Sequence, residues 1–282
     1  MRDKIDDDLE PPRRRRRFRR VPVRIIVPNL VTLLALALGL TSIRLAVEGL
    51  YDGAVLAIVA AAVLDGLDGR IARALRGTTR FGAELDSLAD FVDFGVAPAL
   101  LLYFWSLQEI KSFGWFAAMV FAIACALRLA RFNVTMDDPE KPAWSAHFFV
   151  GMPAPAGAIV GLLPVYLSLS VIGLPHGRDW VPAEIVYVLF IAFLMISPIP
   201  HFSFKKIGRV PREWFIPVLF GIAVTILLLA TFTMEMLIAL SLLYLALVPV
   251  AIRHQRDLQR AVPTASGPAV AELDHAGQEA IR

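Results

Sequence analysis

Long runs of apolar residues dominate the chain, without the regular polar positions that mark an amphipathic helix. The stretches 30–43 and 216–231 carry no charged residue at all, whereas a surface helix of a soluble protein keeps a polar face along its length. An apolar run of about twenty residues is long enough to cross the hydrocarbon core of a bilayer as a helix. The pattern therefore predicts an all-α protein built from transmembrane helices.

Eight apolar segments come close to this length, which predicts a polytopic bundle of about eight transmembrane helices. Their expected bounds are 28–47, 51–75, 83–107, 113–133, 151–173, 183–199, 214–232 and 235–252. The fifth segment contains Pro153, Pro155 and Pro164, so we expect a helix that is broken and covered by its neighbours. Almost no residues separate the last two segments, which predicts a tight helical hairpin.

These segments divide the chain into four expected parts. A basic arm or interfacial helix covers 1–27, a six-helix core covers 28–200, a transmembrane hairpin covers 201–252, and a flexible tail covers 253–282. The tail is assigned from its composition, which turns to Ala, Pro, Gly, Ser and scattered charge. Cys125 is the only cysteine, which excludes a disulfide framework and a cysteine metal cluster.

Charge then predicts the orientation in the membrane. Arginines cluster between residues 13 and 24, directly before the first apolar segment, where they mark a cytoplasmic end more often than a nucleic-acid-binding tail. With the N-terminus inside, the loops after the second, fourth and sixth segments hold most of the remaining basic residues. We therefore expect a multi-pass protein of a bacterial inner or plasma membrane, with both termini cytoplasmic, membrane lipids as neighbours and no nucleic-acid partner.

Four aspartates form the most informative group. Asp65 and Asp68 end the second segment, while Asp86 and Asp90 begin the third, and each spacing places a pair on one helix face. Carboxylates at a bilayer boundary are costly without partners, so cations must lie between them. Oxygen ligands without His or Cys favour Mg²⁺ or Mn²⁺ over zinc, and two such ions suit displacement at phosphorus.

The residues between the two acidic pairs suit a phosphate-bearing ligand. Gly69 and Gly82 leave backbone accessible, and Arg73 offers a forked cation for phosphate oxygens. Taken singly, the same residues are explained by helix packing and by the positive-inside bias. Their joint spacing with the four aspartates favours the ligand site.

The whole set reads D-x2-D-G-x2-A-R-x8-G-x3-D-x3-D and resembles the signature of the CDP-alcohol phosphatidyltransferase family at every specified position. The resemblance implies transfer of a phosphatidyl group from CDP-diacylglycerol to an alcohol in phospholipid biosynthesis, with the active site on the cytoplasmic side. It also implies that the four aspartates bind two divalent ions and that Asp90 is the general base. The residues that would bind CDP-diacylglycerol are Gly69, Arg73, Thr79 and Gly82, with Asn29 and Thr32 from the early PNLVT stretch.

Two later stretches bear on the acceptor alcohol. ALRLARFNV at 126–134 and FFVGMPAPAGA at 148–158 are similar to bacterial members of this family that use serine, the phosphatidylserine synthases. Arg128 or Arg131 then supplies a cation for the serine carboxylate, with Asn133 beside them, although interfacial snorkelling explains the two arginines equally well. The alternative acceptors within the family are those of phosphatidylglycerophosphate and phosphatidylcholine synthases.

Two further questions stay open at this point. A cation channel or transporter also carries intramembrane acids, but here the acids gather at one membrane face. Asp93 lies outside the signature, and it either binds an acceptor amine or supports the ligands, or pairs with an arginine of another segment, which is the usual arrangement for intramembrane acids. Exposed apolar helices also make a homodimer plausible.

Overall fold

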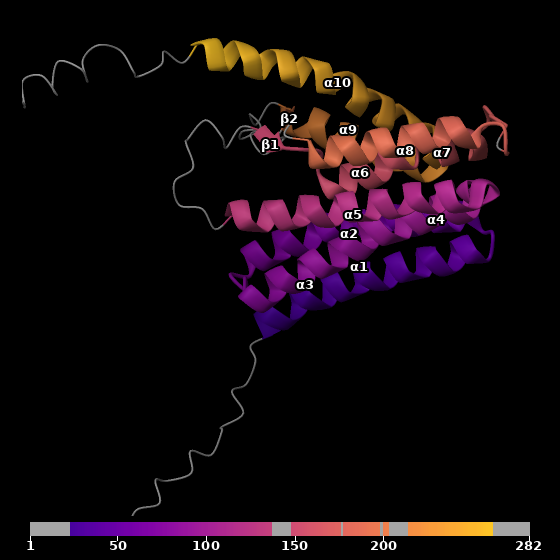
Figure 1. Ribbon diagram of the computed structural model, residues 1–282. Coiled ribbons are helices and arrows are strands. Elements are labelled where there is room, and N and C mark those ends of the chain that lie inside the picture. Colours follow the sequence, from indigo (N-terminus) through magenta and orange to yellow (C-terminus); the bar gives the residue numbers. More distant parts are fainter. Residues whose placement is uncertain (1–22, 137–147, 176, 198–199, 203–213, 262–282) are drawn as a thin grey trace, which may run out of the picture.

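The computed structural model describes residues 23–136, 148–175, 177–197, 200–202 and 214–261. Over these residues the chain is a bundle of helices with one small two-stranded ribbon (Figure 1). The longer elements are α1 (Val23–Val47), α2 (Tyr51–Ala74), α3 (Arg80–Phe91), α4 (Ala97–Trp105), α5 (Lys111–Met136), α8 (Val181–Ile196), α9 (Phe215–Thr231) and α10 (Thr233–Ala261). The shorter ones are η1 (Val92–Val96), η2 (Leu107–Ile110), α6 (Ala154–Gly161), α7 (Leu163–Leu169), β1 (Phe148–Val150) and β2 (Pro200–Phe202).

The helices form a polytopic membrane bundle. Four helical segments of the described chain are long and apolar enough to cross a bilayer, at Arg24–Val47, Arg80–Trp105, Leu107–Thr135 and Thr233–Arg253. Helix α2 has 24 residues, enough for a span, but it ends in the charged residues of the acidic motif. The all-helical membrane fold expected from the apolar pattern is confirmed, and each of the eight predicted segments corresponds to a helix or a broken pair of helices.

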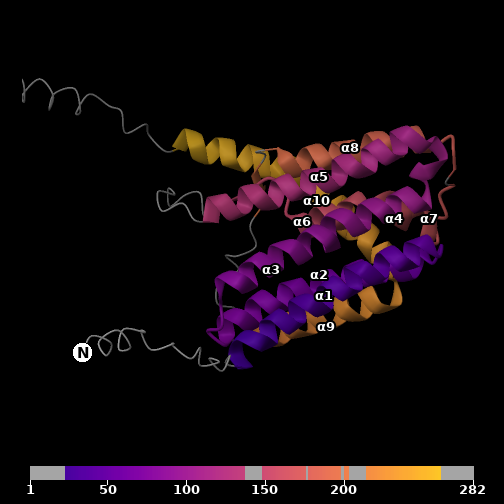
Figure 2. The same cartoon turned by 60° about the horizontal axis from the view of Figure 1, so that its bottom comes forward.

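Helices α1, α2 and α3 lie side by side along the first part of the chain (Figure 2). Helix α3 continues through the π-helical turn η1 into α4, so residues 80–105 cross the bundle as one segment. Helices α4, α5, α6 and α8 enclose the apolar core, with Phe94, Phe121 and Tyr166 among its fully buried side chains. This packing places the end of α2 beside the start of α3, where the acidic motif lies.

Prolines break the fifth predicted segment as expected. Pro153 precedes α6, which ends at Gly161, and α7 begins at Leu163 with Pro164 in its first turn. Proline lacks the backbone N–H that a helix interior needs, so it is tolerated at these first-turn positions. The predicted single span is therefore two short helices that meet at Leu162.

The ribbon was not predicted by the apolar pattern. Strands β1 and β2 pair antiparallel, with Phe148 opposite Phe202 and Val150 opposite Pro200. Gly151, directly after β1, has a φ of +83°, and a Cβ there would lie 2.8 Å from the carbonyl oxygen of Met195. Only glycine fits this conformation and this close approach, so the start of α6 is held against the end of α8.

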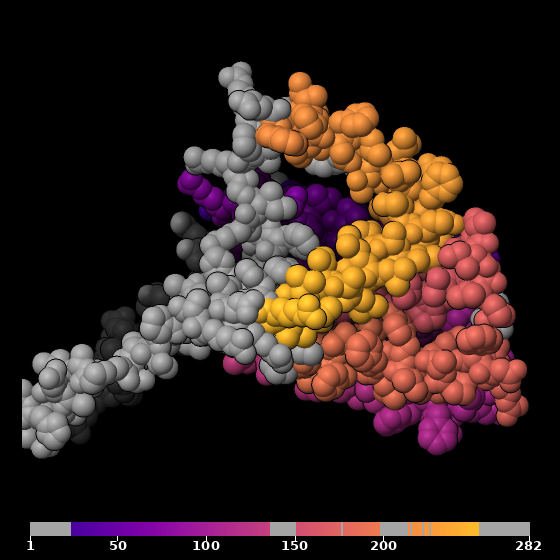
Figure 3. All heavy atoms as spheres, turned by 90° about the horizontal axis from the view of Figure 1, so that it is seen from above, coloured from indigo at the N-terminus to yellow at the C-terminus, as the bar shows by residue number. Residues whose placement is uncertain are grey.

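The short connection predicted between the last two segments is confirmed, since Phe232 alone separates α9 from α10, but the two helices do not pack along each other as the expected tight hairpin. They meet at this residue and diverge from it, as Figure 3 shows for the orange and yellow segments. Helix α10 continues to Ala261, past residue 252 where the last predicted span ends, and α1 begins at Val23, before the predicted residue 28. The arm before residue 23 and the tail after residue 261 lie outside the described residues.

Candidate active site

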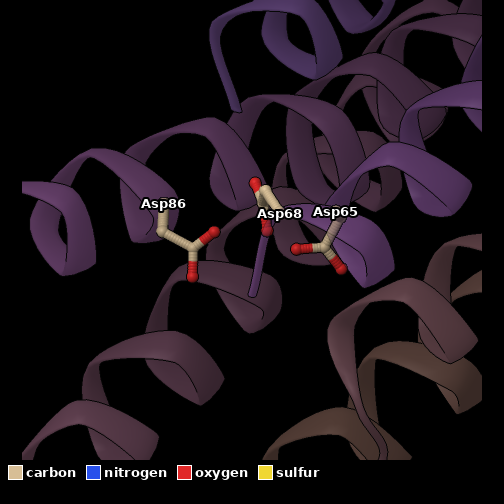
Figure 4. A group of neighbouring side chains, drawn as sticks. All are labelled: Asp65, Asp68 and Asp86. Atoms are coloured by element: carbon tan, nitrogen blue, oxygen red, sulfur yellow. The ribbon is translucent and has the colours of Figure 1, made fainter. Parts of the chain in front are cut away.

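Three carboxylates converge where α2 ends and α3 begins. One oxygen each of Asp65, Asp68 and Asp86 lie within 4.8 Å of one another, and Figure 4 shows the three side chains pointing toward a common centre. Oxygen ligands of a hard divalent ion bind at about 2.0–2.6 Å, so ligands of one ion lie within about 5 Å of each other. The spacing of this cluster therefore fits a divalent metal ion.

Asp90 joins the cluster beside Asp65, since both carboxylates line the same pocket. Asp90 lies one turn after Asp86 on α3, so the i,i+4 spacing gives both carboxylates the same face. Together the two helices assemble all four predicted aspartates into one site. The spacing placed each acidic pair on one helix face, and the structure brings the two pairs together.

The acidic cluster borders a pocket of about 720 Å³. Asp65, Asp86 and Asp90 form one side of it, and Arg128 and Asn133 of α5 form another. The pocket also contains seven residues that the sequence pattern did not single out for this site: Arg80, Ala83, Glu84, Ser87, Leu129, Phe132 and Pro155. Helical spacing from Asp86, Asp90 and Arg128 could have identified Ala83, Ser87 and Phe132, whereas Pro155 lies on α6.

Asp68 is the most deeply buried of the four signature aspartates, and α1 supplies its partner. Thr32 Oγ1 donates a hydrogen bond of 2.7 Å to Asp68 Oδ2, and both residues are about 5% exposed or less. A buried carboxylate that accepts such a bond has a fixed orientation. Thr32, expected at the nucleotide site, therefore also orients a candidate metal ligand.

The start of α3 brings together three of the predicted nucleotide-site residues. Thr79 caps the helix, because its Oγ1 accepts a 3.0 Å hydrogen bond from the backbone N–H of Gly82, as expected for a threonine N-cap. A Cβ on Gly82 would lie 2.9 Å from the amide oxygen of Asn29. Glycine at this position thus lets α1 and α3 approach each other at the edge of the acidic site.

Arg73 folds back over Gly69, one turn earlier on α2. A Cβ on Gly69 would lie 3.4 Å from a guanidinium nitrogen of Arg73, so a larger side chain would crowd the arginine. Arg73 is otherwise exposed at the end of the helix. It follows Asp65 and Asp68 along α2, where a planar cation can reach phosphate oxygens.

Arg128 and Arg131, equivalent in the sequence pattern, have different surroundings. Arg128 lines the pocket, and its guanidinium carbon lies 5.5 Å from the ring centre of Phe132. Arg131 instead donates a 2.9 Å hydrogen bond to the carbonyl oxygen of Ile196, the last residue of α8. A cation at a helix C-terminus stabilises the unpaired carbonyls there, so Arg131 ties α5 to α8.

Asn133 lies at the exposed rim of the pocket and joins α5 to α3. Its Nδ2 donates a 2.9 Å hydrogen bond to Ser87 Oγ, and Ser87 Oγ donates to the carbonyl oxygen of Ala83. The amide oxygen of Asn133 is the atom of this side chain that can accept a bond from a ligand. The pocket therefore presents a guanidinium and an amide oxygen opposite the acidic cluster.

Asp93 is buried, with 1% of its surface exposed, in the π-helical turn η1. It packs against Gly39 of α1, where a Cβ would collide with Asp93 Oδ1. That oxygen has no hydrogen-bond partner among the described residues, and no arginine of the described chain forms an ion pair with Asp93. The arginine partner expected from the sequence is therefore not found there.

A second pocket, of about 210 Å³, lies away from the carboxylates. Its lining is chiefly apolar and includes Trp105, Leu163, Leu167, Trp180 and Tyr187. These residues come from the end of α4, from α7 and from the start of α8. This pocket lacks the clustered oxygen ligands that a divalent ion needs, and the candidate active site is therefore the acidic pocket.

Known proteins are similar to this chain over the segment that contains the acidic motif. A family model described as CDP-alcohol phosphatidyltransferase matches residues 25–196, which contain the four aspartates. A CDP-diacylglycerol–serine O-phosphatidyltransferase of Mycobacterium leprae (strain TN) is 41% identical over 256 residues, covering 86% of this chain and 80% of the relative. Proteins of the same name from Helicobacter pylori (strain ATCC 700392 / 26695) and Methanocaldococcus jannaschii are 36% and 35% identical, each over 64% of this chain and over 74% and 87% of the relative.

Proposed function

The chain belongs to the CDP-alcohol phosphatidyltransferase family, and we propose that it transfers the phosphatidyl group of CDP-diacylglycerol to L-serine. The products are phosphatidylserine and CMP. The observation that carries the proposal is the pocket that joins three signature aspartates to Arg128. Anionic ligands for metal ions and a cation for the acceptor carboxylate thus face one cavity. The names of the similar proteins, which state serine as their substrate, support the same acceptor.

Two divalent ions, Mg²⁺ or Mn²⁺, are proposed to bind at the aspartates. Asp65, Asp68 and Asp86 have the spacing of ligands to one ion, and Asp90, which lines the same pocket as Asp65, completes the set for a second. When bound, such ions neutralise charge on the transferring phosphate. The protein's part is to hold four carboxylates in a fixed arrangement through Thr32 and through the packing of both α2 and α3 against α1.

The donor is proposed to bind across the junction of α1, α2 and α3. Arg73 would bind a phosphate oxygen of the CDP moiety, since it follows Asp65 and Asp68 along α2 and Gly69 leaves room for it. The proposed CDP-diacylglycerol contacts also include Gly82, Thr79, Asn29 and Thr32. Two of these, Thr79 and Gly82, form the cap of α3. The cap would hold the backbone at the start of α3 in the conformation that binds the ligand.

Asp90 is proposed as the general base. The serine hydroxyl oxygen attacks the β-phosphorus, the bond from that phosphorus to the bridging oxygen breaks, and CMP leaves with that oxygen. The hydroxyl proton passes to Asp90. This aspartate lines the pocket together with Arg128, so a serine whose carboxylate binds Arg128 would present its hydroxyl toward Asp90.

The acceptor site is proposed to use Arg128 and Asn133. A guanidinium binds a carboxylate with two parallel hydrogen bonds, and the amide oxygen of Asn133 can accept a bond from the serine ammonium. Arg131 lies on the same helix, but its bond to the carbonyl oxygen of Ile196 favours a role in holding α8. Of the two arginines considered, Arg128 is therefore the proposed carboxylate ligand.

The proposed location is a bacterial inner membrane, with the active site and both termini on the cytoplasmic side. The motif lies at the junction of α2 and α3, which is one of the basic loops of the charge pattern, and cytoplasmic loops carry the excess of Lys and Arg. CMP and serine would then exchange directly with the cytoplasm. The homodimer expected from the exposed apolar helices stays a prediction.

An acceptor screen tests the proposal. Purified full-length protein in detergent, with CDP-diacylglycerol and Mn²⁺ or Mg²⁺, should release CMP when serine is added. It should release none with glycerol 3-phosphate or choline. Release with one of those alcohols instead of serine would overturn the serine assignment and leave the family unchanged. No release with any of the alcohols would contradict the enzyme function itself.

A further inference from the structure

Of the described residues that line the acidic pocket, Glu84 carries the only carboxylate that the proposed chemistry does not use. Asp65, Asp86 and Asp90 line the pocket with it, and all three are assigned to the metal ions. Glu84 lies on α3, outside the spacing of the signature, and its side chain is exposed. The pocket therefore contains one negative charge beyond the proposed metal site.

Two hydrogen bonds place Glu84 close to Asn133 of α5. Asn133 Nδ2 donates a 2.9 Å bond to Ser87 Oγ, and Ser87 Oγ donates a 3.1 Å bond to the carbonyl oxygen of Ala83. Glu84 directly follows Ala83 and precedes Ser87 by three residues, so Glu84 and Ser87 are neighbours on the surface of α3. Glu84 and Asn133 therefore border neighbouring parts of the pocket wall, where the acceptor is proposed to bind.

No cation of the described chain forms an ion pair with Glu84. Arg80 precedes it by four residues on α3, the spacing at which ion pairs form along a helix, and Arg80 lines the same pocket. The ion pair found among the described residues joins Arg44 to Glu48 instead. The charge of Glu84 is thus available to a cationic group that enters the pocket.

We propose that Glu84 binds the ammonium group of the acceptor serine. The inference rests on the proposed function, in which Arg128 binds the serine carboxylate. An ammonium group has three N–H donors, so it can bond Glu84 and the amide oxygen of Asn133 together. Removing an ammonium group from water is costly unless an opposite charge compensates it, and the other carboxylates of the pocket are assigned to the metal ions.

The spacing along α3 suits a molecule of the size of serine. Glu84 precedes Asp90 by six residues, which is about 9 Å along the helix axis. Two hydrogen bonds of about 2.8 Å, one at each end of the ligand, and the two carbon atoms between the serine hydroxyl and amine span a comparable distance. One serine molecule can therefore direct its hydroxyl to Asp90 and its ammonium group to Glu84.

The consequence concerns the choice between acceptor alcohols. Arg128 alone would also attract glycerol 3-phosphate, which is an anion, and Glu84 alone would also attract choline, which is a cation. With both residues in one pocket, Glu84 repels the phosphate and Arg128 repels the choline ammonium. The two charges together therefore select an acceptor that carries both an ammonium and a carboxylate group.

Kinetics of the Glu84→Gln variant test this inference in the full-length protein in detergent. The readout is phosphatidylserine formed from labelled serine, with 3-hydroxypropanoate, which is serine without its amine, as competitor. Glutamine keeps the size of the side chain and removes its charge. The KM for serine should rise about three- to tenfold, between the effect of losing an exposed ion pair and that of losing a buried hydrogen bond to a charged group. The inhibition constant of 3-hydroxypropanoate and the KM for CDP-diacylglycerol should stay unchanged.

The matched control is Glu109→Gln, because Glu109 is an exposed glutamate of η2 that does not line the pocket. Thermal unfolding checks that both variants are folded, and Glu84→Ala replaces Glu84→Gln if the latter is not. An unchanged serine KM in the Glu84 variant overturns the inference alone, and so does an equal rise in the serine KM and in the inhibition constant of 3-hydroxypropanoate. If the wild type uses another alcohol in place of serine, the proposed function is overturned and the inference with it.

Discussion

Thr32 of α1 donates a 2.7 Å hydrogen bond to the carboxylate of Asp68, thirty-six residues later in the chain. The same hydroxyl lies 3.2 Å from the carbonyl oxygen of Pro28, but a hydroxyl has one proton to donate, and the carboxylate is the closer and stronger acceptor. The bond leaves the remaining lone pairs of Asp68 available to a metal ion. Helix α1 therefore contributes to the proposed metal site without supplying a ligand.

Substitution of Thr32 by valine should weaken metal binding. Valine keeps the shape of the side chain and removes the hydroxyl, so Asp68 loses its orienting partner. Changes of this kind typically cost about 10- to 100-fold in metal affinity. The measurement is CMP release as a function of Mn²⁺ concentration, with Thr41→Val as control because Thr41 bonds only the backbone of its own helix. An unchanged Mn²⁺ requirement would show that Thr32 does not orient a metal ligand.

Neutralising Asp90 should abolish most of the activity while leaving the fold intact. Asn keeps the volume of the side chain but cannot take the serine proton or bind a cation as a carboxylate does, and loss of a general base costs about 10²- to 10⁴-fold in rate. The assay is CMP release at saturating serine and Mn²⁺, and EDTA should abolish it in the wild type. Asp52→Asn, an exposed aspartate in the first turn of α2, is the control. Activity of Asp90→Asn near the wild-type rate would exclude Asp90 as base.

The helices could be predicted because each apolar run is so long that a single irregular turn does not hide its pattern. The breaks at Pro153 and Pro164 followed from the missing N–H of proline. The ribbon was different, since β1 and β2 have three residues each and pair across some fifty residues of chain. No local pattern marks so short a strand, and its pairing depends on where α6 and α8 pack.

The acidic site could be predicted because its spacing is local, with both pairs set by helix periodicity. Arg128 and Arg131 could not be told apart in the same way, since they are three residues apart on one helix. What distinguishes them is the end of α8, which reaches Arg131 from Ile196 across 65 residues of sequence.

Gly39 provides the space for the buried carboxylate of Asp93, and Gly39→Ala should destabilise the protein. A Cβ at this position would collide with Asp93 Oδ1, and overpacking of this kind costs about 1–3 kcal/mol. Thermal unfolding in detergent measures the loss, and Asp93→Ala should relieve it in the double mutant because the collision is removed. Gly221→Ala, where the added Cβ meets open space, is the control. Equal stability of Gly39→Ala and wild type would contradict this packing.

Exchanging each of the two arginines for methionine should separate binding from stability. Arg131→Met removes the cation at the C-terminus of α8, so the melting temperature should fall by an amount corresponding to about 0.5–2 kcal/mol, with the serine KM unchanged. Arg128→Met should instead raise the serine KM by at least about tenfold, because a guanidinium bound to a carboxylate contributes about 1.5–3 kcal/mol. Both variants are compared in the same detergent by thermal unfolding and by CMP release over a range of serine concentrations. A raised serine KM for Arg131→Met, with a normal one for Arg128→Met, would reverse the assignment and identify Arg131 as the acceptor ligand.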